Sequence, residues 1–290
     1  MNADHRDRAG DARAGHAYGH TPFRIPLPVQ TIVDTLSARS EVVAIALGGS
    51  QATKNADAAS DVDISVFVTA DIPLDVRRNL ATRFDPAPEI DNRWFGPTDE
   101  WADAASGTAI DLMYWERGWF EEQLRAVIED HRPALGYTTA LWFTMRHATS
   151  LFDRDGWLAG MQDDATRPYP DELARAIVAF NHPLLRTARS SWRHQIDLAI
   201  TRDDPVSIQH RATELLASVF DIVFASTRAL HPGEKRLLMH VEALEGVPAH
   251  LPHRIRALLH AASGADRAAV LPAVDDLCDA IDELVHASGL

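Results

Sequence analysis

Short apolar stretches alternate with stretches of helical spacing over roughly the first half of the chain. Residues 41–47 (EVVAIAL) are apolar and rich in β-branched side chains, which predicts a buried strand. Residues 61–68 (DVDISVFV) alternate polar and apolar side chains, which predicts a strand with one polar face. Residues 108–115 predict a third strand. The spacing predicts helices at 29–39, 74–84 and 119–130 and a less regular strand at 86–91. Strands alternating with helices indicate a small α/β or α+β domain.

The pattern changes to helical spacing after about residue 135. Residues 138–152 predict a helix, or a helix followed by an extended segment. Residues 171–200 predict one or two helices with an interruption near Pro183, and 206–230 predict one long amphipathic helix. Further helical stretches reach the C-terminus, so we expect an α-helical bundle of about four to six helices.

These patterns divide the chain into three parts. Residues 1–22 are polar and aperiodic, and we expect a disordered tail. Residues 23–135 are expected to form the domain that carries the chemistry, and residues 136–290 an α-helical accessory domain.

Composition excludes several classes of protein. Hydrophobic residues make up 46% of the 290 and charged residues 24%, which excludes wholesale disorder. There is no apolar run of the roughly 18 to 20 residues that a bilayer span needs, and the N-terminus lacks the apolar core of a secretory signal. The single cysteine, Cys278, excludes an internal disulfide and a Cys-rich zinc site. A cytoplasmic protein is expected.

The charge is strongly negative and unevenly distributed. The net charge is −14, and residues 41–130 alone contain 18 acidic and 7 basic residues. Such a field repels phosphate backbones, so nucleic acid is not an expected partner. It favours divalent cations and positively charged small molecules, although most of these carboxylates are expected to lie on a solvated surface.

One stretch combines features that suit phosphate and metal binding. The apolar strand ends in Leu47-Gly48-Gly49-Ser50, and ten residues later comes Asp61-Val-Asp63-Ile. Glycine lets the backbone approach a ligand closely, and consecutive N–H groups with a serine hydroxyl can hold a phosphate. Asp61 and Asp63 are two residues apart on a strand, so both side chains leave the same face. Carboxylate pairs of this kind suit Mg²⁺, which also takes water and phosphate oxygens as ligands.

A third carboxylate lies within the predicted strand at 108–115. Asp111 is flanked by apolar residues, where an acid is costly unless it is paired, bound to metal or directed into a cleft. If this strand lies beside 61–68, three carboxylates converge and can hold two Mg²⁺ ions. A Gly-Gly-Ser turn alone, or an Asp-x-Asp pair alone, is unspecific; their combination with a strand-borne third acid is much more specific.

The sequence resembles the polymerase-beta-type nucleotidyltransferase superfamily. Its signature is an apolar residue, Gly, Gly or Ser, a short gap and then Asp-apolar-Asp/Glu-apolar, which residues 47–50 and 61–64 match. Asp111 falls where the third carboxylate of that family is expected. The resemblance covers about residues 29–130. The helical half, including 231–238 (HPGEKRLL), resembles less specifically the accessory helical domain of antibiotic nucleotidyltransferases.

The resemblance implies an α+β fold with a small mixed sheet, flanking helices and a cleft facing the helical domain. It also implies that Gly49 and Ser50 contact the triphosphate, that Asp61 and Asp63 bind two Mg²⁺ ions, and that Asp111 binds one of them beside the attacking hydroxyl. In some members an acid of the helical domain is the general base, so the base is left open between that acid and Asp111.

Weaker candidates surround this motif. Gly48 belongs to the expected phosphate turn, and Lys54 and Lys235, the two lysines of the chain, could reach the triphosphate. Glu89 is a possible extra carboxylate, and Asp197 and Glu214 are two acids in the helical half. An acidic and aromatic insert could line an acceptor pocket; it contains Arg93, Trp94, Asp99, Glu100, Trp101 and Asp103. The histidines at 182, 194, 210, 231, 240 and 250 lack metal-ligand spacing and are expected to be surface or satisfied core residues.

The expected activity is Mg²⁺-dependent transfer of a nucleoside monophosphate, with ATP as the default donor or another nucleoside triphosphate in its place. The expected acceptor is a small hydroxyl compound, and an aminoglycoside-like polycation fits the acidic charge. Two alternatives remain open at this point. One is a protein acceptor, as in adenylylating enzymes of toxin–antitoxin type, and the other is a non-catalytic nucleotide-binding sensor.

Overall fold

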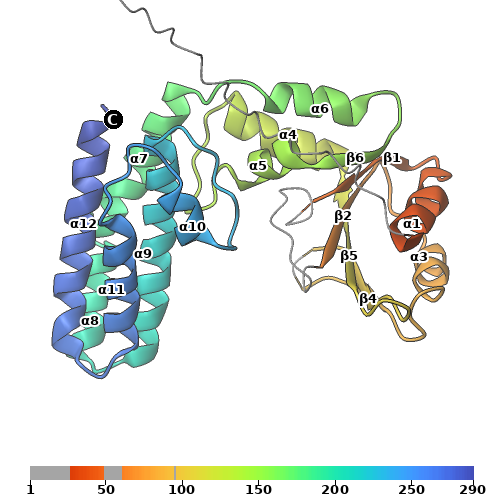
Figure 1. Ribbon diagram of the computed structural model, residues 1–290. Coiled ribbons are helices and arrows are strands. Elements are labelled where there is room, and N and C mark those ends of the chain that lie inside the picture. The colour runs from red at the N-terminus through yellow and green to blue at the C-terminus, as the bar shows by residue number, and fades with distance from the viewer. Residues whose placement is uncertain (1–26, 49–60, 95) are drawn as a thin grey trace, which may run out of the picture.

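The computed structural model describes residues 27–48, 61–94 and 96–290. The secondary-structure elements form two parts (Figure 1). One part is a β-sheet with helices packed on it, and the other is a bundle of helices. The expected tail, residues 1–22, lies outside the described residues. Among the described helices, none has the length and apolar character that a membrane span requires.

The described strands form one six-stranded sheet in the order β3-β4-β5-β2-β1-β6. Only β2 and β5 are parallel; the other neighbours are antiparallel, so the sheet is mixed as predicted. The strands are β1 (Val42–Leu47), β2 (Val62–Val68), β3 (Glu89–Asn92), β4 (Thr98–Ala102), β5 (Ala109–Glu116) and β6 (Thr149–Asp153).

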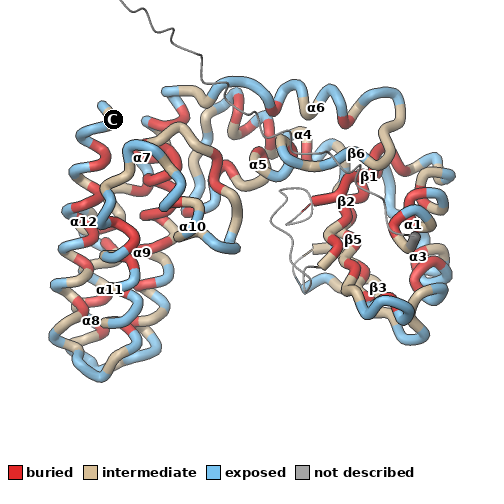
Figure 2. Tube along the Cα trace, in the orientation of Figure 1, coloured by how far each residue is buried: buried red, intermediate tan, exposed pale blue. Residues whose placement is uncertain are grey.

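Each face of the sheet is covered differently. On one face, apolar residues of the central strands pack with α1 and α3 into a single cluster. On the other face, Phe67 near the end of β2 packs under α4, α5 and α6, which leaves the beginning of β2 outside this cover (Figures 1 and 2). These helices are α1 (Leu27–Ser37), α3 (Leu74–Ala81), α4 (Arg117–Ile128), α5 (Ala140–His147) and α6 (Trp157–Ala165).

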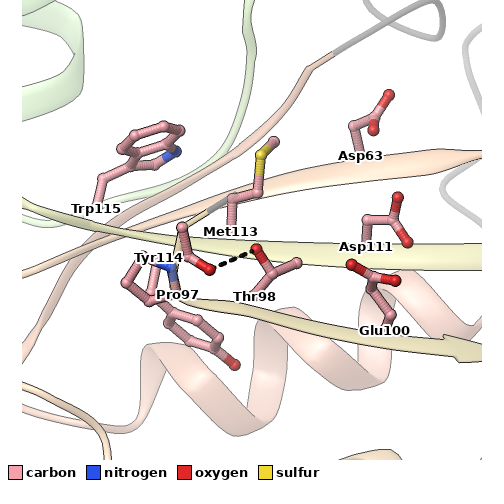
Figure 3. A pocket seen from close by; sticks show the side chains of 9 residues that line it. Asp63, Pro97, Thr98, Glu100, Asp111, Met113, Tyr114 and Trp115 are labelled. Atoms are coloured by element: carbon pink, nitrogen blue, oxygen red, sulfur yellow. Dashed lines mark hydrogen bonds between the residues drawn. The ribbon is translucent and has the colours of Figure 1, made fainter. Parts of the chain in front are cut away.

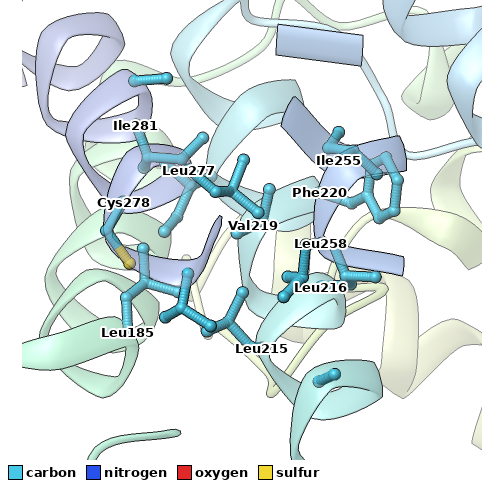
Figure 4. Close-up of a cluster of buried hydrophobic side chains, with 14 of the residues drawn as sticks. Leu185, Leu215, Leu216, Val219, Phe220, Ile255, Leu258, Leu277, Cys278 and Ile281 are labelled. Atoms are coloured by element: carbon cyan, nitrogen blue, oxygen red, sulfur yellow. The ribbon is translucent and has the colours of Figure 1, made fainter. Parts of the chain in front are cut away.

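The C-terminal helices share a separate apolar core. The long α9 lies at its centre and packs against α7, α8, α11 and α12 (Figures 1 and 4). Leu173 and Ile177 of helix α7 also belong to the apolar cluster in which Phe67 packs with α4, α5 and α6, so α7 contacts both parts. The helices are α7 (Asp171–Arg186), α8 (Trp192–Thr201), α9 (Pro205–Ser226), α10 (Leu237–Glu242), α11 (Leu251–Ser263) and α12 (Val270–Ala287).

Three features differ from or extend the sequence expectation. Residues 171–200 form two helices, which is one of the expected alternatives, but α7 continues through Pro183 to Arg186. The break comes instead at 187–191, where Ser191 caps α8 by accepting a hydrogen bond from the His194 N–H. Strand β4 was not predicted. The helix-then-extended alternative for 138–152 is confirmed by α5 followed by β6, which joins the sheet beside β1.

Candidate active site

Carboxylates from three neighbouring strands form a row on one face of the sheet. In the parallel pairing of β2 with β5, Asp63 is the register partner of Asp111. In the antiparallel pairing of β4 with β5, Glu100 is the partner of the same Asp111. Register partners present their side chains on the same face. The three carboxyl groups accordingly lie side by side and point the same way (Figure 3).

Asp61 belongs to the same group of charges. It immediately precedes β2 and is half-buried. Its negative charge raises the pKa of both Asp63 and Asp111, although burial is the larger cause at each. The three carboxylates predicted from the motif are therefore brought together, with Glu100 as a fourth that sequence reasoning had placed only in a possible pocket-lining insert.

The pKa of Asp111, the central carboxylate of the row, is raised. Burial, followed by the charges of Glu100, Asp63 and Asp61, raises the pKa of Asp111 to about 6. Carboxylates packed at this density favour the binding of a cation, because a cation offsets their mutual repulsion.

The donor set suits a hard cation that has further ligands of its own. In the described part of the chain, no three acidic, histidine or cysteine side chains converge closely enough to hold a metal unaided. Asp63 and Asp111 nevertheless offer paired carboxylate oxygens, and Mg²⁺ commonly takes one or two carboxylates with the rest of its shell from water and phosphate. The residues therefore fit Mg²⁺ bound together with a polyphosphate.

A positive charge from the helical part acts on the row. Lys235 lies in the loop between α9 and α10 and is exposed. Its ammonium group lowers the pKa of both Asp63 and Asp111, against the larger effect of burial. The two parts of the molecule thus contribute opposite charges to one place.

The expected phosphate turn begins beside the row. Gly48 follows β1, and its N–H donates a hydrogen bond of 2.8 Å to the Asp63 carbonyl. This bond places the start of the turn directly next to Asp63. The other predicted triphosphate contacts of this segment, Gly49, Ser50 and Lys54, lie outside the described residues.

A cavity of about 150 Å³ opens along the row, and Asp63, Asp111 and Glu100 all line it. The carboxylates of the row line one end, and Met113 and Trp115 line the other (Figure 3). The Trp115 indole N–H donates to Ser65 Oγ at 3.3 Å, and its ring stacks on Trp119 with centroids 5.5 Å apart. The cavity therefore combines an acidic end with an ordered aromatic wall.

Most of the weaker candidates have structural roles. Glu89 pairs in register with Glu100 but is exposed at the edge strand, and Arg93 binds Asp91. Asp99, Trp101 and Asp103 are buried: Asp99 binds Arg77, Trp101 packs in the core, and Asp103 accepts hydrogen bonds from Ser106. Trp94 is 79% exposed. Asp197 and Glu214 are half-buried on α8 and α9, and no described hydrogen bond or ion pair joins them to the row.

Glu100 was expected only within an insert that could line an acceptor pocket, because strand β4 was not predicted from the sequence. The signal was present in the alternation of Thr98, Glu100 and Ala102 with the buried Asp99 and Trp101. That alternation does not reveal which strand lies next to it, so it could not place Glu100 beside Asp111.

The match to a protein-family model agrees with the geometry. A model of the nucleotidyltransferase domain family matches residues 29–135, whereas no protein of curated function matches the chain. One similar solved structure is the crystal structure of a nucleotidyltransferase-like protein from Exiguobacterium sibiricum 255-15. The two sequences are 13% identical, and the structural match has a TM-score of 0.45. It spans 90% of this chain and 75% of the Exiguobacterium chain. Residues 29–135 therefore form a nucleotidyltransferase domain of the polymerase-beta-type superfamily, and this domain supports an enzyme that transfers nucleotidyl groups.

Proposed function

We propose that the protein transfers AMP from ATP to a hydroxyl group of a small acceptor in a Mg²⁺-dependent reaction. The observation that carries the proposal is the register pairing of Asp63 with Asp111, within reach of the charge of the exposed Lys235. Asp63 and Asp111 would share a cation, and Lys235 would bind phosphate beside them. That arrangement suits a nucleoside triphosphate better than an uncharged substrate.

In this proposal each carboxylate has a defined role. Asp61 and Asp63 would hold two Mg²⁺ ions, and Asp111 would hold one of them. The ions supply charge neutralisation on the triphosphate when bound. Lys235 would contact the triphosphate from the helical part, and the 48–50 turn and Lys54 would contact it from the sheet part.

The reaction joins the acceptor to the α-phosphorus. The acceptor oxygen forms a bond to this phosphorus while the bond from the phosphorus to the α–β bridging oxygen breaks. Pyrophosphate leaves with the bonding electron pair, and the hydroxyl proton passes to a nearby base. Asp111 is our candidate for that base, because it lines the cavity in which the hydroxyl would lie.

The cavity supports a cationic acceptor. Asp63, Asp111 and Glu100 all line it. The expected phosphate turn begins at Gly48, which is bonded to Asp63, whereas Glu100 lies two strands away from Asp63 in the sheet. An acceptor entering there meets Glu100 and Asp111 together with the ring of Trp115. Carboxylates beside an aromatic face suit a sugar-like compound that carries ammonium groups, as aminoglycosides do.

A protein acceptor is the second candidate, and one observation favours it. Trp94 is 79% exposed and lies two residues before Gly96, which lines the cavity. An exposed tryptophan at the rim of a site is a common anchor for a protein partner.

The test is transfer from ATP labelled at the α-phosphate, in MgCl₂, to a panel of aminoglycosides and to proteins of a bacterial lysate. Label on a small molecule, with pyrophosphate released, supports the first proposal, and label on a protein supports the second. Tight ATP binding without transfer to any acceptor would favour a sensor and contradict both.

Asp63→Asn tests the metal role within that assay. It keeps the shape of the side chain but removes half of the paired charge, so we expect transfer to fall by about 100-fold or more. The control is Asp75→Asn, which removes an exposed carboxylate from α3 on the opposite face of the sheet. Undiminished turnover in Asp63→Asn would refute the proposed site.

A further inference from the structure

The loop that carries Lys235 is held by a buried histidine. We define the Lys235 loop as residues 227–236, between α9 and α10. His231 lies within it and is 1% exposed. Its Nδ1 atom accepts a hydrogen bond of 3.1 Å from the Gly233 N–H, two residues before Lys235. This bond folds the segment that leads into Lys235 back onto the histidine ring.

The same histidine is bound from the sheet part. The loop between α4 and α5, residues 129–139, reaches the bundle, and the His231 N–H donates to Thr139 Oγ1 at 2.7 Å. The ring of Tyr137 lies edge-on to the His231 ring, with the two centroids 4.8 Å apart. The centroid of the Phe224 ring lies 4.9 Å from that of the His231 ring. His231 is therefore fixed both through its backbone and through its ring.

These contacts make a continuous connection between the two charged sides of the site. Asp111 lies on β5, and β5 leads directly into α4. Helix α4 leads into the 129–139 loop, whose Thr139 binds His231, and the bond from His231 to Gly233 leads to Lys235. Two hydrogen bonds thus lie on the path that connects the carboxylate row to Lys235.

We propose that Thr139 and His231 are positioning residues that fix Lys235 in the place from which it contacts the triphosphate. The inference rests on the proposed function, because it takes the contact of Lys235 with phosphate from it. Neither residue touches substrate in this proposal; both act through the backbone of the Lys235 loop.

The chemistry of His231 agrees with this role. Its Nδ1 can accept from Gly233 only while the ring is neutral. Burial lowers the pKa of His231 to about 4, which keeps the ring neutral near pH 7. Gly233 has φ of +99°, a left-handed conformation that side chains rarely adopt, so the turn depends on glycine.

The experiment measures binding of α,β-methylene-ATP with Mg²⁺ by calorimetry, because this analogue cannot donate AMP. Lys235→Ala should weaken binding by about tenfold or more, which is typical for a lost contact between charged groups. Thr139→Val keeps the shape but lacks the acceptor oxygen, and should weaken binding by roughly three- to tenfold. Thr139→Ser retains the oxygen and should bind like the unmodified protein.

The decisive measurement repeats Thr139→Val in the Lys235→Ala background. If Thr139 acts through Lys235, its effect there should shrink to less than about 1.5-fold. An effect of equal size in both backgrounds, or none in either, would overturn the inference. The matched control is Ser226→Ala, which removes a buried hydroxyl that has no hydrogen-bond partner among the described residues.

Two further outcomes separate this inference from the proposed function. If the unmodified protein does not bind the analogue, the proposed function falls and the inference falls with it. If it binds and Asp63→Asn weakens the Mg²⁺-dependent binding, additive effects of Thr139→Val and Lys235→Ala overturn the inference alone. Should Thr139→Val fail to fold, Gly233→Ala replaces it in the same cycle, because a methyl group there meets no atom within 4 Å and only the backbone is strained.

Discussion

Replacing Asp221 with asparagine should remove a pH-dependent loss of stability from the helical bundle. Asp221 lies on α9 and is 2% exposed. It accepts hydrogen bonds from the Thr138 N–H at 3.0 Å and from Thr138 Oγ1 at 2.5 Å. Burial outweighs these bonds and raises the pKa of Asp221 from an ordinary 3.8 to about 6.

The magnitude follows from the linkage between proton binding and folding. Below about pH 4 the carboxyl group is protonated in both the folded and the unfolded chain, so its contribution to stability is fully present. Between about pH 4 and pH 6 only the unfolded chain loses the proton, and the free energy of unfolding falls. At about 1.4 kcal/mol per pH unit, the complete loss is about 3 kcal/mol, and it persists above pH 6.

An asparagine side chain at this position would keep the hydrogen bonds without the charge. Its carbonyl oxygen can accept from the Thr138 N–H, and its amide can donate to Thr138 Oγ1. The stability of Asp221→Asn minus that of the unmodified protein should therefore rise by up to about 3 kcal/mol between pH 4 and pH 6, and stay constant above. Other carboxylates also make the stability depend on pH; the Arg193 guanidinium, for example, lowers the pKa of Asp275. Their contributions are the same in both proteins and cancel when the two stabilities are subtracted.

The assay is urea unfolding at several pH values from 4 to 8 at constant ionic strength, followed by fluorescence and circular dichroism. The control Glu283→Gln removes one negative charge from the surface of α12, and any pH dependence it shows is the background for Asp221→Asn. A difference that stays flat from pH 4 to pH 7, or that falls, would refute the reasoning.

Two further predictions concern the packing around the site. Arg77→Met should lower the free energy of unfolding by about 3–5 kcal/mol, because Arg77 and Asp99 form a buried ion pair and Asp99 would stay buried without it. Arg77→Met combined with Asp99→Asn should cost clearly less than the sum of the single changes in a double-mutant cycle, and strict additivity would contradict the pairing. Gly136→Ala should cost about 1–3 kcal/mol in urea unfolding, since Gly136 has φ of +77° and a new methyl group would lie 2.9 Å from Ala217 Cβ. Ala217→Gly by itself should cost about 1 kcal/mol, because it puts glycine inside α9. In a double-mutant cycle it should cost less in the Gly136→Ala background, and equal costs in both backgrounds would show that backbone strain alone is responsible.

Local pattern was sufficient for the central strands and for the motif. The alternation of 61–68 depends only on the geometry of one strand, so it predicted that Asp61 and Asp63 share a face before any pairing was known. Asp111 stood out for a similar reason, as a single acid within an apolar strand. The expectation of a second, helical part followed from side-chain spacing alone.

Only the tertiary structure decided how these pieces meet. The register that sets Asp111 between Asp63 and Glu100 comes from the pairing of β5 with its neighbour in sequence, β4, and with β2, which is distant in sequence. A one-residue slip would turn a carboxylate to the other face. Pro183 shows the same limit, because packing of α7 against α9 maintains a helix where the local rule predicted a break.

The contact between His231 and Thr139 is likewise beyond sequence. A buried histidine whose backbone N–H donates to a threonine hydroxyl gives no spacing signal, and that threonine lies 92 residues away in the chain. A sequence therefore specifies which side chains share a face of their own strand or helix, because that geometry repeats every few residues. Which faces meet is decided by packing of the whole chain, and in this protein that packing brings Lys235 opposite the carboxylates.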